Sequence, residues 1–297
     1  VTRKIYDFSP EQMRNLAAIV CLYRGQRVRF LALVNDYLVR VCEESAAIPA
    51  ALTTFETTLA DLRGRFDRLA DAAAKPGALE VDKTAPLADA ATELREASAL
   101  YEADRKKLLA SLRAFGEKYA KALPGENDKQ HAARAAFDGN AEAIRGLIKQ
   151  VDLLYKLAAR IADLGAELAA DEAISAAYDR RATAKLVKQL DEERKAAVEQ
   201  LKQAVYFHRQ VAWLQDRFPN VELQAVPGLV KLVDRAEIEA ADWSLTPGRY
   251  VGVAPPEEDD DFDFEQTLRD IHVELADLNK EAAELAVKIQ TNFEELG

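Results

Sequence analysis

The sequence contains few of the residues that disulfide frameworks and metal sites require. Its 297 residues include 2 cysteines and 3 histidines. Two cysteines are too few for a disulfide framework or a thiolate metal cage. On one continuous helix, Cys21 and Cys42 would lie about 32 Å apart, which is beyond the reach of a disulfide. We therefore expect a reducing, cytoplasmic setting.

Long apolar runs are also missing. The longest uninterrupted run, Leu16 to Tyr23, has 8 residues, whereas a membrane-spanning helix needs about 18. No charged start leads into an apolar stretch with a cleavage site, so we expect no secretory signal. We also expect no membrane partner.

The motifs of cofactor-dependent enzymes are absent from the sequence. No two of its 12 glycines stand two residues apart, so there is no Gly-x-Gly fingerprint for a dinucleotide and no phosphate loop. No Pro-Pro pair follows Asn, Asp or Ser. His131, His208 and His272 each lack a histidine at i+3 or i+4 that could share a metal ion. We therefore expect no catalytic, cofactor-binding or metal-binding residue in this chain.

Acidic charge is concentrated at one end of the sequence. Residues 257–297 hold 14 acidic and 3 basic side chains, which equals the net charge of -11, and the preceding residues hold 37 of each sign. The first 40 residues carry 7 basic and 3 acidic side chains. The overall acidity therefore does not argue against a nucleic-acid partner. Arg24, Arg27 and Arg29 are candidates for contact with phosphate, and a surface or interdomain salt bridge is the alternative.

Apolar residues recur at helical spacing along most of the chain. Ser9, Pro10 and Gln12 form a helix-start signature, and we expect that helix to break near Arg24-Gly25. A strict heptad stripe comes next. Its positions are Ile48, Leu52, Phe55, Leu59, Leu62, Phe66 and Leu69. Further stripes occupy 86–119, 144–168 and about 172–218. Because Pro-Gly turns separate the early segments, we expect long antiparallel coiled-coil helices.

The last 80 residues differ in composition. Residues 219–256 are rich in Pro and Gly, and we expect β-prone pieces at 221–226 and 250–253 and a helical turn at 236–240. The acidic run 257–263 predicts an extended linker, with a charge-steered docking segment or a shield against stray DNA as the alternative. A heptad then returns, and such a helix of about 30 residues is marginal alone, which predicts a partner-binding surface. Its stripe is Phe264, Leu268, Ile271, Leu275, Leu278, Ala282, Leu285 and Ile289.

These patterns predict an all-α fold with long antiparallel coiled-coil helices, a short irregular segment with minor β, and a C-terminal heptad helix. We divide the chain into a helical segment (1–45), helical arms (46–218), an irregular segment (219–256), and a linker with the terminal helix (257–297).

Three features have two interpretations from the sequence alone. His208 lies near an apolar stripe and is either a packing histidine or a functional one. Glu192-Glu193 is either part of a solvated face or an acid–base pair. Residues 242–250 form either a structural turn with two buried aromatics or part of a recognition surface.

Two stretches of the sequence resemble a known family. The first is Thr2-Arg-Lys-Ile-Tyr-Asp-Phe-Ser-Pro-Glu-Gln-Met13 with its continuation to residue 34. The second comprises Val226-Pro-Gly-Leu-Val-Lys231, the block Asp242-Trp-Ser-Leu-Thr-Pro-Gly-Arg-Tyr-Val-Gly-Val253, the acidic linker and the terminal heptad. They are similar to the regions just after the catalytic domain and at the carboxyl end of methylation subunits of type I restriction–modification systems. The resemblance covers 2–38 and 223–297.

The resemblance implies a function through assembly. Such subunits methylate the N6 of adenine in DNA with S-adenosylmethionine, using a Gly-rich motif and an Asn-Pro-Pro-aromatic motif. Both motifs are absent here, so the chain would correspond to the noncatalytic carboxyl-terminal part and would be inactive alone. The implied partners are the specificity subunit, the catalytic domain of the same enzyme and DNA. Self-association of the isolated chain is a further expectation. The alternative is a self-contained structural or regulatory coiled-coil protein.

Overall fold

The computed structural model describes residues 8–75, 81–120, 125–170 and 172–254, together with residues 275, 282 and 285. The chain forms two units, residues 1–224 and 225–297, and each is described by itself. Within the described residues the regular structure is helical, apart from one isolated β-bridge between Val226 and Val230. The prediction of an all-α fold with long helices is therefore confirmed.

Helix α1 (Pro10–Tyr23) begins with the predicted capping box. The Ser9 hydroxyl accepts a hydrogen bond from the Gln12 amide at 3.2 Å, and the Gln12 side chain accepts one from the Ser9 amide at 2.9 Å. Two of the amides that a helix start leaves unpaired are thereby satisfied. The helix ends at the predicted break, where Gly25 has φ +70°, a conformation that a residue with a Cβ rarely adopts.

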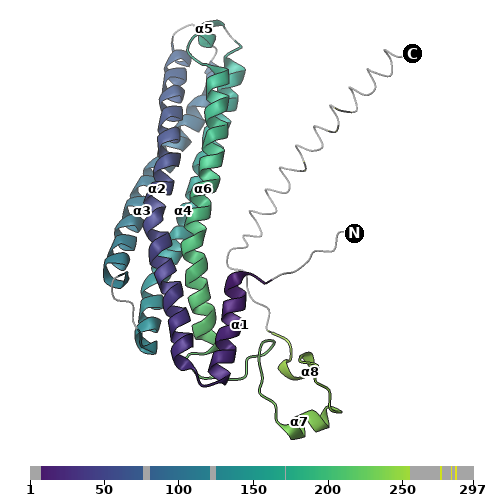
Figure 1. Cartoon of the computed structure of the whole chain (residues 1–297). Coiled ribbons are helices and arrows are strands. Elements are labelled where there is room, and N and C mark those ends of the chain that lie inside the picture. The colour runs from purple at the N-terminus through teal and green to yellow at the C-terminus, as the bar shows by residue number, and fades with distance from the viewer. Residues whose placement is uncertain are drawn as a thin grey trace, which may run out of the picture. The chain divides into compact units, whose positions relative to one another are not determined.

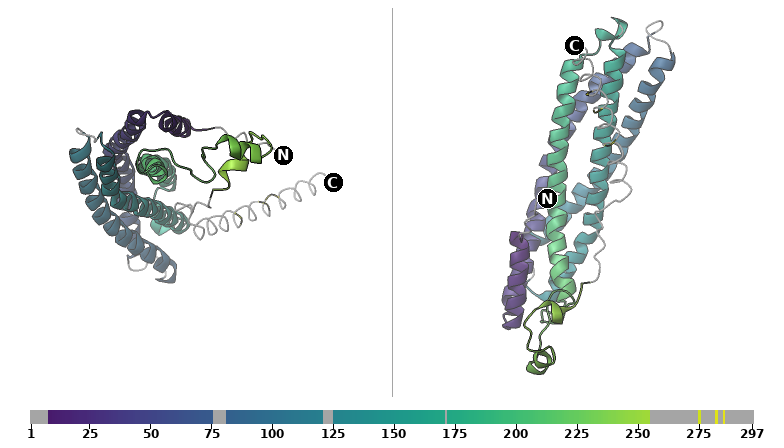
Figure 2. Two further views of the ribbon diagram at one scale, coloured as in Figure 1. Left: turned by 90° about the horizontal axis from the view of Figure 1, so that it is seen from below. Right: turned by 90° about the vertical axis from the view of Figure 1, so that its right-hand side faces the viewer.

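Four long helices form an up-and-down bundle (Figures 1 and 2). They are α2 (Arg27–Ala73), α3 (Val81–Tyr119), α4 (Asn127–Leu168) and α6 (Arg180–Arg217). Each contacts the next in this order, and α6 returns to α2, which closes the bundle. At a rise of about 1.5 Å per residue, α2 alone is about 70 Å long. The predicted antiparallel arrangement of long helices is confirmed.

The bundle core follows the predicted stripes. All seven heptad positions of α2 are buried, with exposed fractions between 0% and 5%. Aromatic rings pack edge to face within the core. One example is Phe115 against Phe137, with 4.9 Å between the ring centres. Ser98 of α3 is polar but buried, and its hydroxyl is satisfied locally because it donates to the Leu94 carbonyl at 2.6 Å. Burial of each large apolar side chain contributes about 1.5–3 kcal/mol, so these stripes hold the four helices together.

Helix α2 runs through Pro49 without a break. It is also continuous across residues 45 and 46, where the sequence analysis places a boundary. Pro49 is exposed, whereas its neighbours Ile48 and Leu52 are fully buried. Packing of the buried side therefore maintains the helix although proline supplies no amide hydrogen to it.

The stripe expected over 172–218 is interrupted. A short helix, α5 (Glu172–Ser175), precedes α6, and residues 176–179 lie between them. The carboxylate of Asp179 caps α6 by accepting a hydrogen bond from the Ala182 amide at 3.0 Å. The signal for this second start was present in the sequence, since Asp is among the preferred capping residues.

The second unit contains two short helices, α7 (Arg235–Ala240) and α8 (Gly248–Val251). Helix α7 confirms the predicted helical turn. The expectation of a β-prone piece at 250–253 is wrong, because Tyr250 and Val251 belong to α8. The amides of Arg249 and Tyr250 bond back to the carbonyls of Thr246 and Pro247 at 3.1 and 2.9 Å, so the turn that begins at Thr246 continues as a helix.

Candidate protein-binding and phosphate-binding surfaces

The terminal heptad stripe is described at three positions. Leu275, Ala282 and Leu285 are each helical and exposed, and spacings of seven and three residues place them on one side of a helix. The exposed fractions of the two leucines are 53% and 55%. The other predicted stripe residues, Phe264, Leu268, Ile271, Leu278 and Ile289, lie outside the described residues.

A second apolar surface lies on α1. Ala18, Ile19 and Leu22 are buried against the bundle, and the opposite side of the helix exposes Met13 (55%), Val20 (47%) and Tyr23 (66%). We call these three residues the outer face of α1. A helix that is apolar all round is usually covered on both sides, and exposed apolar patches mark interaction surfaces. This surface was not predicted from the sequence, although the apolar run from Leu16 to Tyr23 was its signal.

Helix α1 is fixed to the bundle by a buried polar network. The Asn15 side-chain amide donates to Gln210 of α6 at 2.8 Å and accepts from the Tyr37 hydroxyl of α2 at 2.9 Å. Burial raises the pKa of Tyr37 to about 12, so this hydroxyl keeps its proton and remains a donor at neutral pH. The outer face of α1 is therefore presented by a helix with a defined position.

The three predicted phosphate-contact residues lie at the α1–α2 turn and at the start of α2. Arg24, Arg27 and Arg29 are all exposed. Arg27 forms an ion pair with Glu222, which is the salt-bridge alternative realised within the first unit. The side chains of Arg24 and Arg29 make no ion pair with a described residue. Phosphate contact stays a prediction for these two arginines.

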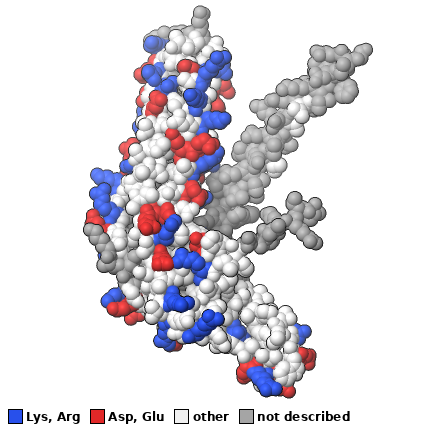
Figure 3. Space-filling model, viewed as in Figure 1, with Lys and Arg blue, Asp and Glu red and all other residues white. Residues whose placement is uncertain are grey.

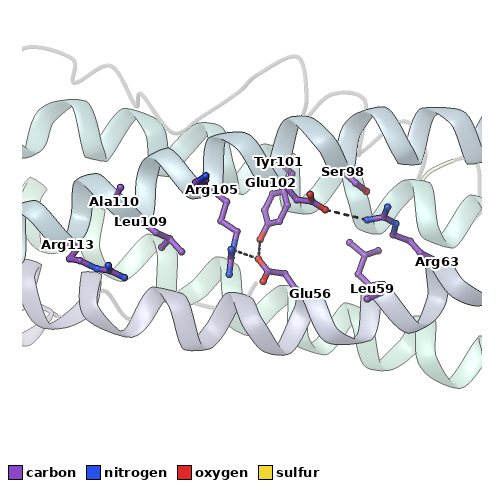
Figure 4. Close-up of a pocket in the computed structure, with 12 residues that line it drawn as sticks. Glu56, Leu59, Arg63, Ser98, Tyr101, Glu102, Arg105, Leu109, Ala110 and Arg113 are labelled. Carbon is purple, nitrogen blue, oxygen red and sulfur yellow. Dashed lines mark hydrogen bonds and ion pairs between the residues drawn. The ribbon is translucent and has the colours of Figure 1, made fainter.

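A groove of about 650 Å³ runs between α2 and α3 (Figure 4). The Tyr101 hydroxyl donates to Glu56 at 2.7 Å, and the guanidinium of Arg105 pairs with the same carboxylate. Burial and this hydrogen bond raise the pKa of Tyr101. Arg63 faces Glu102 at 3.5 Å. Each carboxylate of the groove pairs with an arginine, and these contacts tie α3 to α2.

His208 occupies a packing position. The residue is 7% exposed, the centre of its ring lies 5.2 Å from the centre of the Phe137 ring, and its Nε2 lies 2.9 Å from Asp138 Oδ1. Burial lowers the pKa of His208 despite the neighbouring carboxylate. A neutral histidine inside the bundle agrees with the packing interpretation. His131 Nε2 lies 3.1 Å from the Pro219 carbonyl oxygen, and His272 lies outside the described residues.

The acidic pair Glu192-Glu193 belongs to a polar helix surface. Glu192 is exposed and pairs with Lys195 at 3.0 Å, and Glu193 accepts a hydrogen bond from Gln189 at 2.8 Å. Both partners lie on the same helix. The geometry supports the interpretation as a solvated face.

The turn at 242–250 exposes one of its aromatic side chains. Trp243 is 55% exposed, so the expectation of two buried aromatics is wrong for this residue, while Tyr250 is half-buried. Asp242 and Trp243 both have positive φ, at 54° and 57°, which is unusual for a bulky side chain. The Arg235 guanidinium lies 5.6 Å from the indole ring. A strained backbone that holds out an exposed indole favours the recognition-surface interpretation.

Comparisons with known proteins give no assignment. No protein-family model matches the chain, and no match exists among the curated proteins or the solved structures. In the part of the chain that the structure describes, no group of three or more His, Cys, Asp or Glu side chains could hold a metal ion. No helix there combines the length and apolar character needed to cross a membrane. Cys21 and Cys42 are both free thiols.

Proposed function

We propose that the chain is the helical assembly region of an adenine-N6 DNA methyltransferase subunit of a type I restriction–modification system. Its terminal heptad helix binds the specificity subunit, and its long bundle braces the enzyme on DNA. The observation that carries the proposal is the exposed position of Leu275, Ala282 and Leu285 on one side of a helix. An apolar stripe of this kind needs a partner helix to cover it.

The outer face of α1 supports a second contact, with the catalytic domain. The sequence resemblance places α1 directly after that domain. A helix held by the Asn15 network and apolar on its far side is suited to transmit a fixed orientation from one domain to the next. In this proposal the parent enzyme binds S-adenosylmethionine and the chain itself does not, so calorimetry with the cofactor should give no binding heat.

The test is a co-purification assay with the specificity subunit. Replacing Leu275 and Leu285 by Asp removes two exposed leucines from the stripe, each worth about 1.5–3 kcal/mol when buried in a complex. Affinity should therefore fall by more than about 100-fold, and the subunit should no longer co-purify.

A matched control introduces the same two negative charges at positions outside the stripe. The heptad spacing predicts that Val273 and Val287 lie opposite the stripe, so the Val273→Asp, Val287→Asp variant should co-purify at the wild-type yield. Undiminished recovery of the specificity subunit with the Leu275→Asp, Leu285→Asp variant would refute the proposal.

A second candidate is a self-contained structural or regulatory coiled-coil protein without an enzymatic role. The observation that favours it is the closed bundle, in which α2, α3, α4 and α6 bury their apolar stripes on one another. In this case the terminal helix needs no second protein. Its stripe would be covered within the same chain or by another copy of it.

A further inference from the structure

The exposed side of α6 carries a line of basic residues, most of which have no ion-pair partner among the described residues. Its members are Arg181, Lys185, Lys188, Lys195 and Lys202, all exposed. Spacings of 4, 3, 7 and 7 residues keep them within about a quarter turn of one another around the helix. The line spans about 31 Å along the helix axis. We call these five residues the α6 basic line.

Many other cations of the bundle pair with neighbouring carboxylates. On the face drawn in Figure 3, basic and acidic side chains are intermixed over much of the surface. The arginines and lysines in ion pairs include Arg14, Arg27, Arg40, Arg63, Arg65, Arg105, Lys129, Arg134, Arg145, Arg160 and Arg194. On the α6 basic line only Lys195 is paired, with Asp191 and Glu192. Arg181, Lys185, Lys188 and Lys202 have no ion-pair or hydrogen-bond partner among the described residues.

The placement of these charges opposes the stability of the helix. From Arg180 to Lys188, α6 holds four basic and no acidic side chains. The first turn of a helix carries partial positive charge, so Arg180 and Arg181 are unfavourable there, and the like charges of Arg181, Lys185 and Lys188 repel one another at spacings of four and three residues. A sequence shaped only by the stability of α6 would place acidic residues in these turns. A local conflict of this kind is expected where function requires it.

The chemistry of the line fits a phosphate backbone better than a protein surface. No large apolar side chain of α6 is among the exposed hydrophobic residues, so the line lacks the buried anchors on which protein interfaces depend. Phosphate binding needs only placed cations. The 31 Å span is close to one turn of B-DNA, about 34–36 Å. One arginine and four lysines along one side of a helix serve as phosphate contacts, which carry no sequence information.

We propose that the α6 basic line binds the backbone of duplex DNA without sequence preference. This inference rests on the proposed function, which places the bundle beside DNA, and it names the helix face that makes the contact. Glu192 and Glu199 lie on the same side and Lys195 is paired with Asp191 and Glu192, so the contact is assigned to the four unpaired cations.

The experiment measures binding of the full chain to a 30-base-pair duplex of arbitrary sequence, by fluorescence anisotropy between 50 and 200 mM salt. The test variant is Arg181→Gln, Lys185→Gln, Lys188→Gln. The control variant, Lys106→Gln, Lys107→Gln, Lys118→Gln, removes three exposed cations from α3, which is not adjacent to α6 in the bundle. Circular dichroism checks that both variants remain helical.

We expect the test variant to bind at least about tenfold more weakly at 50 mM salt, and its logarithmic salt slope to be shallower by about 2–3. The control variant should bind like the wild type. Equal weakening of both variants, or no binding of the wild-type chain at 50 mM salt, would overturn the inference. So would loss of specificity-subunit binding by the test variant with unchanged DNA binding, because that result assigns the line to a protein partner. Co-purification of the wild-type chain with the specificity subunit tests the proposed function separately.

Discussion

At the scale of single residues, two glycines of α4 occupy opposite environments. A Cβ on Gly165 would lie 2.7 Å from Leu69 Cδ2 and 2.8 Å from Tyr178 Cζ, whereas a Cβ on Gly146 would meet nothing within 4 Å. The Tyr178 ring has little freedom to move, because its hydroxyl donates to the Ala162 carbonyl at 2.8 Å. The absence of a side chain at Gly165 therefore permits α4 to pack closely against Leu69 and Tyr178 at this end of the bundle.

We expect Gly165→Ala to lower the free energy of unfolding by about 1–3 kcal/mol, since overpacking forces neighbours to shift. Gly146→Ala should raise it by about 0.5–1 kcal/mol, because alanine favours an exposed helical position. Urea denaturation of both variants measures the two changes. If Gly165→Ala proves as stabilising as Gly146→Ala, the close contact of Gly165 with Leu69 and Tyr178 would be contradicted.

His208 makes the stability of the bundle depend on pH. Burial lowers its pKa in the folded protein below the usual value near 6.5. Below that pH the unfolded chain takes up a proton that the folded chain resists, so the free energy of unfolding should fall as the pH drops from 7.5 to 5.5. His208→Gln removes this titration, and the variant should lose less stability over the same range in urea denaturation. An identical pH dependence of wild type and variant would contradict this account.

At the scale of helices, the sequence predicts burial better than it predicts where helices end. Every expected heptad position of α2 is buried. A seven-residue apolar repeat places its residues along one side of a helix, and that side packs against neighbouring helices. The run through Pro49 was not predictable from local propensity, since packing of Ile48 and Leu52 overrides the missing amide. The start of α6 at Asp179 was predictable from its capping side chain, yet the apolar spacing across 174–186 concealed it.

The candidate surfaces also divide into one that the sequence predicts and two that only the structure reveals. The terminal stripe was predicted from the sequence, because a heptad repeat marks one apolar side of a helix that another helix must cover. The outer face of α1 and the α6 basic line required the structure, because only the packing of α1 and α6 reveals which side of each helix is exposed. For the α6 basic line, the sequence shows many charges of both signs, and ion pairing decides which cations remain available.

At the scale of the whole molecule, the two proposals for function differ in what covers the terminal helix. The run at 257–263 holds six acidic residues in seven, and self-repulsion in such a run predicts an extended linker. A protease that cuts after acidic residues should therefore cleave the linker early. If the terminal helix binds a specificity subunit, residues 264–297 should be degraded in the isolated chain and survive as a bound fragment when that subunit is added. Mass spectrometry of the digests follows both fragments. Survival of 264–297 in the isolated chain would instead favour the self-contained coiled-coil protein, and sedimentation would then tell whether one copy or two cover the stripe.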